Sequence, residues 1–413
     1  MASLSLPVQI AAIVIFAVTY LGVALGRLPG LRLDRAAIAF CGAALMVGVG
    51  ALKLASAYRA ISGNTIALLF SMMVLAAGLR RAGFFALITN LALRRAGRPL
   101  ALLAAIIAIA GFLSALLVND TICVVITPLV LDIVLALKRN PLPYLMALSA
   151  SANIGSVATI TGNPQDMIIG SISGISYIRF AASLAPVALV GLFITFGLLA
   201  VLFRKDLRVP LLPNPAPAQT SPLHRGLLVK SLLLLGLFVV ASLAGMPPSE
   251  AALIAAALLL LTSGLRSDIL LAGVDWSLLV MFIGLFIVIA GLQEAVITPD
   301  LIKTITAWQP GRPAILVPLT AILSNLVNNV PTVLVLKPFV AALANPKQAW
   351  LLVAMAATFA GNLTLLGSVA NLIVAEAARA RGISLRFADY LRLGIPLTLS
   401  TLVIGTLYLV WVS

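Results

Sequence analysis

The chain has 413 residues, of which 62% are hydrophobic and only 9% are charged, and its mean hydropathy is +1.17. Soluble domains carry about 25% charged residues, so this composition excludes a water-soluble protein and indicates an integral membrane protein. The net charge of +15 does not indicate a nucleic-acid partner, because the basic residues form short clusters between apolar runs rather than one patch.

Apolar runs of membrane-spanning length follow one another along the first half, 1–208. The first run has no preceding basic residue and is too long for a signal peptide, so we expect it to be retained as a helix. The basic amphipathic stretch 84–95 is expected to lie along the membrane surface. The predicted elements are three scaffold helices within 7–79 (7–26, 36–52 and 62–79), an interrupted run 99–137, a run 143–176 broken between Gly155 and Pro164, and a helix 180–203.

The second half, 226–413, repeats this order after a Pro-rich segment, 209–225, that we expect to be a cytoplasmic linker. Its predicted elements are scaffold helices within 226–292 (226–245, 249–263 and 274–292), a stretch 296–307, an interrupted run 313–344, a broken run 348–381 and a helix 387–412.

The similarity between the two halves can be seen directly in the sequence. SALLVNDTICVVITPLV (114–130) aligns without a gap with SNLVNNVPTVLVLKPFV (324–340), an offset of 210 residues, and six positions are identical. Asn153 and Asn362 match at an offset of 209 residues. Self-similarity on this scale indicates two related structural units.

Basic residues flank both ends of the run 99–137, with Arg98 before it and Lys138 after it. We therefore expect this run to enter and leave on the cytoplasmic side, as a re-entrant helical hairpin with Asn119-Asp120 at its tip. Five crossings plus one hairpin per half make the second half inverted. With both termini outside the cytoplasm, most of the 27 Lys and Arg residues lie inside, as the positive-inside rule requires. The prediction is an all-α polytopic protein of two inverted-topology repeats in a bacterial inner membrane.

Four polar breaks interrupt the predicted helices: 118–120, 155–166, 327–331 and 361–371. Backbone without helical hydrogen bonds cannot face lipid, and inverted symmetry would bring the four breaks together near the midplane. There, helix N-termini can hold an anion, while carbonyl, Asn and Asp oxygens can hold a cation, which is typical of secondary transporters. The candidate substrate- and ion-binding residues are Asn119, Asp120, Asn153, Thr159, Thr161, Asn163, Asp166, Asn328, Asn329, Thr332, Asn362, Thr364, Ser368 and Asn371.

Purely local roles compete with binding. Asn119-Asp120 could be only a turn with a helix cap, and Asp166 could only cap its half-helix. Because ionisable groups at membrane depth are costly, we favour a functional role over a purely structural one for Asp120. Asp132 could relay protons, with Lys138 as its partner. The only histidine, His224, lies in the linker, and HExxH and GxSxG motifs are absent, so we expect neither an enzyme nor a metal or organic cofactor.

At these residues the chain resembles the ion transporter superfamily over nearly its whole length. VNDTICVVITP (118–128), NNVPTVLV (328–335), GFF (83–85) and FRKDL (203–207) look most like arsenite permeases, and SANIGSVATITGNPQD (151–166) looks more like anion permease relatives. The resemblance implies an elevator mechanism, in which hairpins and broken helices move against a scaffold that forms a homodimer. Neither tip carries the Ser-Asn-Thr triplet of many dicarboxylate symporters.

The expected function is ion-coupled secondary transport of a small inorganic anion or metalloid, with arsenite or antimonite export as the leading prediction. The alternatives are a sodium/proton antiporter of the NhaD type that uses Asp120 and Asp166, and a permease for dicarboxylates or other anions. The expected partners are the solute, membrane lipid, a second copy of the chain, and H⁺ or Na⁺ as the coupling ion.

Overall fold

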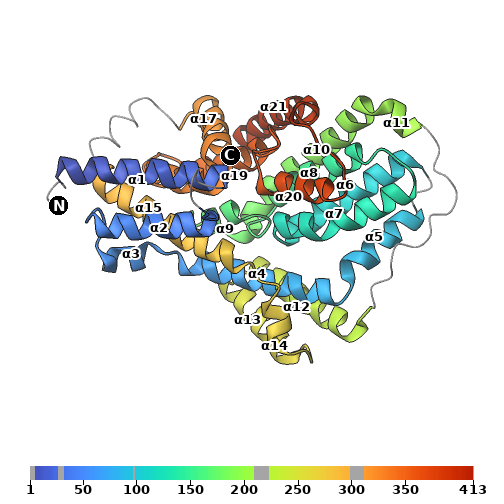
Figure 1. Ribbon diagram of the computed structural model, residues 1–413, viewed down its shortest axis with the longest axis horizontal. Coiled ribbons are helices and arrows are strands. Elements are labelled where there is room, and N and C mark those ends of the chain that lie inside the picture. The colour runs from blue at the N-terminus through green and yellow to red at the C-terminus, as the bar shows by residue number, and fades with distance from the viewer. Residues whose placement is uncertain (1–4, 27–31, 96–97, 209–222, 298–310, 413) are drawn as a thin grey trace.

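The computed structural model describes residues 5–26, 32–95, 98–208, 223–297 and 311–412, and within these ranges all regular secondary structure is helical (Figure 1). Eight helices of the described ranges are long and apolar enough to cross a membrane. The predicted all-α polytopic membrane protein is thereby confirmed.

The helices of the first half follow the predicted order. Two short additions, α3 and α11, were not predicted, and α2 ends before the predicted residue 52 because the chain turns at Gly50, whose φ is 75°. The helices are α1 (Leu6–Leu25), α2 (Arg35–Gly48), α3 (Leu54–Ala60), α4 (Gly63–Arg81), α5 (Phe84–Arg95), α6 (Pro99–Leu116), α7 (Asn119–Ala136), α8 (Leu142–Ser156), α9 (Pro164–Ile172), α10 (Tyr177–Leu202) and α11 (Arg204–Arg208).

The second half follows the same order, with one further short helix, α14. The helices are α12 (Arg225–Leu243), α13 (Pro248–Thr262), α14 (Ser267–Leu271), α15 (Trp276–Val296), α17 (Pro313–Val327), α18 (Asn329–Ala341), α19 (Pro346–Ala360), α20 (Val369–Arg379) and α21 (Phe387–Val412). Linker positions 209–222 and positions 298–307 of the predicted stretch 296–307 lie outside the described residues.

The helices pack as two bundles. In the scaffold bundle (α1–α4 and α12–α15), α2 packs along α15 and α4 along α13. In the core bundle (α6–α10 and α17–α21), α6 packs on α8, α17 on α19, α7 on α20 and α10 on α21. The bundles meet mainly where α4 contacts α9, and to a lesser extent where α1 contacts α17, α15 contacts α18 and α10 contacts α12.

Glycines let the main crossings come close. A Cβ on Gly155 of α8 would overlap the backbone of Gly111 on α6, and a Cβ on Gly284 of α15 would overlap the backbone of Ala39 on α2. Small residues at helix crossings are the usual means of tight packing inside a bilayer, where apolar side chains gain nothing by leaving lipid. The first contact holds α8, the first part of a broken helix, against α6, and the second holds α15 against α2.

Candidate functional site

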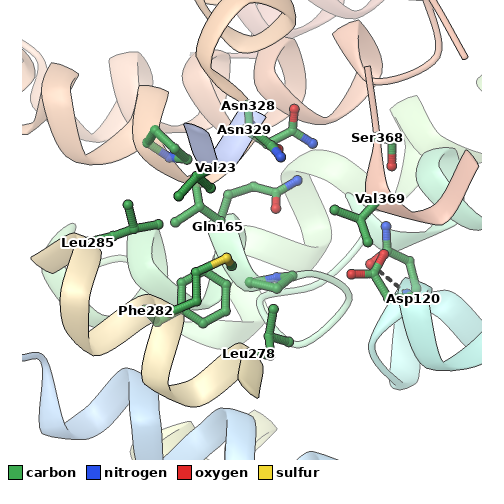
Figure 2. A pocket seen from close by; sticks show the side chains of 15 residues that line it. Val23, Asp120, Gln165, Leu278, Phe282, Leu285, Asn328, Asn329, Ser368 and Val369 are labelled. Atoms are coloured by element: carbon green, nitrogen blue, oxygen red, sulfur yellow. Dashed lines mark hydrogen bonds between the residues drawn. The ribbon is translucent and has the colours of Figure 1, made fainter. Parts of the chain in front are cut away.

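The helix breaks meet at a cavity of about 40 Å³ between the two bundles, here called the inner cavity (Figure 2). A water molecule needs about 10–15 Å³ of such volume, so the cavity holds at most a few water-sized groups. Its lining from the core bundle is Asn119, Asp120, Pro164, Gln165, Asn328, Asn329, Val330, Pro331, Ser368 and Val369, and from the scaffold bundle Val23, Leu278, Met281, Phe282 and Leu285.

The two walls of the inner cavity differ in chemistry. The core wall carries carboxamides, one hydroxyl and the Asp120 carboxylate, whereas the scaffold wall, from α1 and α15, is apolar. Figure 2 shows Asn328, Asn329 and Gln165 across the cavity from Leu278, Phe282 and Leu285 of α15. No Lys, Arg or His is among the lining residues. The cavity therefore offers neutral donors and acceptors together with one acidic group.

The first hairpin turns at Leu117 and Val118, and α7 begins with Asn119 and Asp120. The Asn119 backbone N–H donates to the carbonyl oxygen of Gly162 at 2.9 Å, which ties this tip to the break between α8 and α9. Asp120 lies in the first turn of α7, where a helix N-terminus favours a carboxylate. The ion pairs found among the described residues do not include Asp120. Asp120 is not the N-cap residue of α7, because the N-cap position is Val118.

The second hairpin turns at one residue, Asn328, whose φ of 80° and ψ of 162° are close to a region that glycine alone adopts readily. The Asn328 side-chain oxygen accepts from the Asn329 backbone N–H at 2.7 Å. Asn329 starts α18 as Asn119 starts α7, and its side-chain oxygen accepts a hydrogen bond from the Ser324 hydroxyl at 2.6 Å. Backbone strain held in place at a cavity wall is typical of a binding site.

Asn153, near the end of α8, is the centre of a buried carboxamide network. Its Oδ1 accepts hydrogen bonds from Asn119 Nδ2 at 3.1 Å and from the Ser368 hydroxyl at 2.9 Å. Its Nδ2 donates to Oδ1 of Asn362 at 2.9 Å and of Asn371 at 3.1 Å. The network joins both broken helices to the first hairpin tip, just behind the inner cavity.

The start of α9 is fixed by reciprocal capping. Asn163 Oδ1 accepts from the Asp166 backbone N–H at 2.8 Å, and Asn163 Nδ2 donates to Asp166 Oδ2 at 2.6 Å. Asp166 is fully buried, and its second carboxylate oxygen has no partner among the described residues. Gln165, between them, lines the inner cavity and donates to the Thr358 hydroxyl at 3.1 Å.

Of the predicted site residues, the structure brings Asn119, Asp120, Asn328, Asn329 and Ser368 to the inner cavity. Asn153, Asn362 and Asn371 lie in the network behind it, and Asn163 and Asp166 in the cap of α9. The hydroxyls of Thr159 and Thr161 bond to each other, and Thr159 also bonds to α6 through Ala115. Thr332 donates to the carbonyl oxygen of Asn328, and the carbonyl oxygen of Thr364 accepts from Asn371.

The expected pairing of Asp132 with Lys138 is wrong, because Asp132 pairs with Arg381 at 2.7 Å. These two side chains are 45% and 44% exposed, so the pair lies at the surface of the described structure rather than in its core. The sequence did not point to Gln165 or to the apolar wall of α15. The position of Gln165 between a cap residue and its partner was the only available signal.

In this helical membrane protein, polar helix breaks converge on a cavity between two bundles. This arrangement is typical of a transporter. The chain belongs to the citrate transporter family, CitMHS, whose model matches residues 13–360 and 301–413. This family is part of the ion transporter superfamily, as the motifs predicted.

Several relatives cover almost the whole chain. The silicon efflux transporter LSI3 of Oryza sativa subsp. japonica is 31% identical and covers 98% of both chains. A 46 kDa membrane protein of Mycobacterium leprae is 30% identical and covers 97% of this chain and 98% of its own. A protein of Dictyostelium discoideum named as transporter arsB is 25% identical, over 91% of this chain and 87% of its own.

The crystal structure of the YdaH transporter of Alcanivorax borkumensis has the same fold, with a TM-score of 0.62, 16% identity and coverage of 98% of both chains. That structure is described as having an unusual topology. The family and these relatives are transporters, so the prediction that the protein is not an enzyme is confirmed.

Proposed function

We propose that this protein exports a small, uncharged metalloid acid, of the type of arsenous or silicic acid, and couples export to an ion gradient. The observation that carries the proposal is the lining of the inner cavity, which has carboxamides, a hydroxyl and one carboxylate but no cationic side chain. Metalloid acids are undissociated near neutral pH and carry several O–H groups. Each O–H group both donates and accepts, which matches the paired donor and acceptor of an Asn or Gln side chain.

The same lining disfavours citrate, which gives the family its name. Citrate carries several negative charges at neutral pH, and in the inner cavity they would lie beside Asp120 without a Lys, Arg or His partner. Buried charges that lack a partner are strongly unfavourable, and proteins usually bind carboxylates with charge-assisted hydrogen bonds from Arg or Lys. The names of the relatives, silicon efflux and arsB, agree with a metalloid solute.

The division of the walls between the bundles supports an elevator mechanism. Every polar group of the inner cavity belongs to the core bundle, and the scaffold contributes only apolar side chains. A core bundle that slides along α15 would carry its solute past a surface that offers no competing hydrogen bonds. The contacts between the bundles are sparse compared with those inside each bundle, which favours such a displacement.

Purified protein in proteoliposomes tests the proposal. Vesicles are loaded with silicic acid, arsenous acid or citrate, and efflux is measured under imposed proton or sodium gradients, with protein-free vesicles as the control. Efflux of a metalloid acid that follows a gradient is expected, with citrate flux at the level of protein-free vesicles. Gradient-driven citrate flux, or sodium–proton exchange that needs no solute, would overturn the proposal.

A further inference from the structure

Gln165 connects the two halves of the core bundle at the inner cavity. It follows the cap residue Asn163 and Pro164 in the first turn of α9. Its side chain is 3% exposed and lines the cavity. Because α9 packs against α18 and α19, this first-half residue lies among helices of the second half. In Figure 2 its carboxamide extends into the cavity on the same side as Asn328 and Asn329.

The protein holds only one end of the Gln165 carboxamide. Nε2 donates to the Thr358 hydroxyl of α19 at 3.1 Å, whereas Oε1 has no hydrogen-bond partner among the described residues. Oε1 is also not enclosed, since it differs from Asp166 Oδ1 in not being one of the buried atoms that lack a partner. Gln165 lines the inner cavity, so its free oxygen offers a neutral acceptor there.

Asn328 and Asn329 of the second hairpin tip are held in the opposite sense. The Asn328 side-chain oxygen accepts from the Asn329 backbone N–H, and the Asn329 side-chain oxygen accepts from the Ser324 hydroxyl. Neither Nδ2 group has a partner within the described part of the chain, and neither is enclosed. The second tip therefore offers donors to the cavity into which α9 offers an acceptor.

This arrangement distinguishes solutes by their O–H groups. A carboxamide oxygen accepts hydrogen bonds but cannot donate one, so only a solute with an O–H group satisfies Gln165 Oε1. A solute with oxygens but no O–H group would leave Oε1 without a donor, which costs more than the missing bond would have contributed. Sites built around a hydrogen bond to a substrate O–H group reject analogues that lack it.

We propose that Gln165 is a specificity-determining residue, whose Oε1 accepts an O–H group of the metalloid acid while Nδ2 of Asn328 and of Asn329 donate to its other oxygens. The bound solute thus bridges the two halves of the core bundle. The class of solute rests on the proposed function. The role of Gln165 rests on the free ends of the three carboxamides at one cavity.

Gln165→Met tests this role, because Met has a similar length but neither the donor nor the strong acceptor of a carboxamide. Initial rates of gradient-driven efflux are measured in proteoliposomes at increasing concentrations of silicic or arsenous acid. KM for both acids should rise about 2- to 10-fold, the effect of one lost hydrogen bond. The maximal rate should stay within about twofold of the parent, since the variant removes a solute contact and not the coupling group.

Trimethylarsine oxide adds a readout of specificity, because it is uncharged and has an oxygen but no O–H group. Its inhibition constant is measured against arsenous acid efflux. In the parent it should inhibit weakly. In Gln165→Met the ratio of its inhibition constant to the KM of arsenous acid should fall, because the variant no longer requires an O–H group.

Two threonines of the second half provide a positioning variant and its matched control. Thr358→Val removes the hydroxyl that holds Gln165 Nε2, and Thr358 does not itself line the inner cavity, so KM should rise without loss of a solute contact of its own. Thr320→Val removes a fully buried hydroxyl of α17 that has no partner among the described residues and lies outside the cavity lining. This control should leave KM unchanged.

The outcomes separate the role of Gln165 from the proposed function. If the parent transports metalloid acids and Gln165→Met has an unchanged KM, the role of Gln165 is wrong and the function stands. A KM that rises equally in Gln165→Met and Thr320→Val, or an unchanged ratio for trimethylarsine oxide, would show a loosened fold and would also overturn the role. Absence of metalloid acid efflux in the parent would overturn the proposed function together with this role.

Discussion

The side-chain amide of Asn153 donates a hydrogen bond to Oδ1 of Asn362 at 2.9 Å, and these two residues hold matching positions in the two halves of the sequence. Equivalent residues of two repeats touch each other only close to the axis that relates the repeats. The contact therefore supports a twofold relation between the two halves. It also explains why an amide is useful here, since Asn can donate to one partner and accept from another.

Asn153→Ala should be among the most destabilising substitutions in the core bundle. It leaves the Asn119 amide and the Ser368 hydroxyl without an acceptor, and removes the donor to Asn362 and Asn371. Each buried group left unpaired costs about 1–3 kcal/mol, so a loss of at least about 2 kcal/mol is expected. Thermal unfolding in detergent measures it, with Asn90→Ala on α5 as the control. Equal melting temperatures for the two variants would contradict a structural role for the network.

A pair of substitutions at Asn328 measures the strain of the second hairpin tip. Asn328→Ala and Asn328→Gly both remove the carboxamide, but only glycine adopts a φ of 80° with ψ of 162° easily. The glycine variant should therefore be more stable than the alanine variant by about 1–3 kcal/mol, the usual cost of such a conformation. Both variants should lose transport. Equal stability would show that the tip is relaxed, and transport by both would place solute binding elsewhere.

Asn119→Ala and Asn329→Ala test the two tips as binding groups. Each residue starts the second helix of a hairpin and lines the inner cavity. Asn119→Ala removes two protein hydrogen bonds, with Asn153 and with the Asp120 backbone N–H, and Asn329→Ala removes one, with Ser324. Each costs about 0.5–1.5 kcal/mol, so both variants should still fold while solute flux falls to background. Flux in proteoliposomes, with melting temperature measured in parallel, separates the two effects. Normal flux in both variants would mean that the tips are only turns.

The polar breaks could be predicted because they contrast with their surroundings. In an apolar run, VND and VNNVP stand out, and backbone that leaves a helix inside a bilayer needs a protein or cavity environment. The alignment of the two hairpins further predicted that Asn119 and Asn329 would hold equivalent places, and both start a helix that lines the inner cavity.

Other features gave no such contrast. Leu278, Phe282 and Leu285 form one wall of the inner cavity, but apolar residues on an apolar helix look the same whether they face solute, protein or lipid. Residue type alone also does not distinguish the roles of Asn side chains. Asn153 hydrogen-bonds to other side chains in a buried network, whereas Asn329 lines the inner cavity. The pairing of Asp132 with Arg381 spans 249 positions and depends on how α7 meets α20.

The Asp132–Arg381 pair should matter little to stability and transport. Both side chains are nearly half exposed, and ion pairs in such surroundings contribute about 0–1 kcal/mol. Asp132→Asn and Arg381→Gln should therefore leave gradient-driven transport within about twofold of the parent, with melting temperatures almost unchanged. A double-mutant cycle on melting temperature measures the coupling between the two residues. Loss of gradient-driven flux in Asp132→Asn would restore the idea that this carboxylate relays protons.

Asp120 breaks the symmetry between the two tips, because the equivalent position of the second tip is Val330. Two similar tips would provide two similar sites, so the carboxylate is the feature that can distinguish a coupling ion from a solute. Asp120 lines the inner cavity and makes none of the ion pairs found among the described residues. An ionisable group at membrane depth is costly, which favours a functional reason for its presence.

Asp120→Asn keeps the shape and the hydrogen-bonding capacity of the side chain but removes its ability to exchange a proton or balance a cation. We expect this variant to lose gradient-driven export while it still exchanges labelled solute across the membrane. Asp166→Asn is the matched comparison, since that carboxylate is buried in the cap of α9 and does not line the inner cavity. If Asp120→Asn is still driven by the gradient and Asp166→Asn is not, the coupling group is Asp166, and the inner cavity binds solute alone.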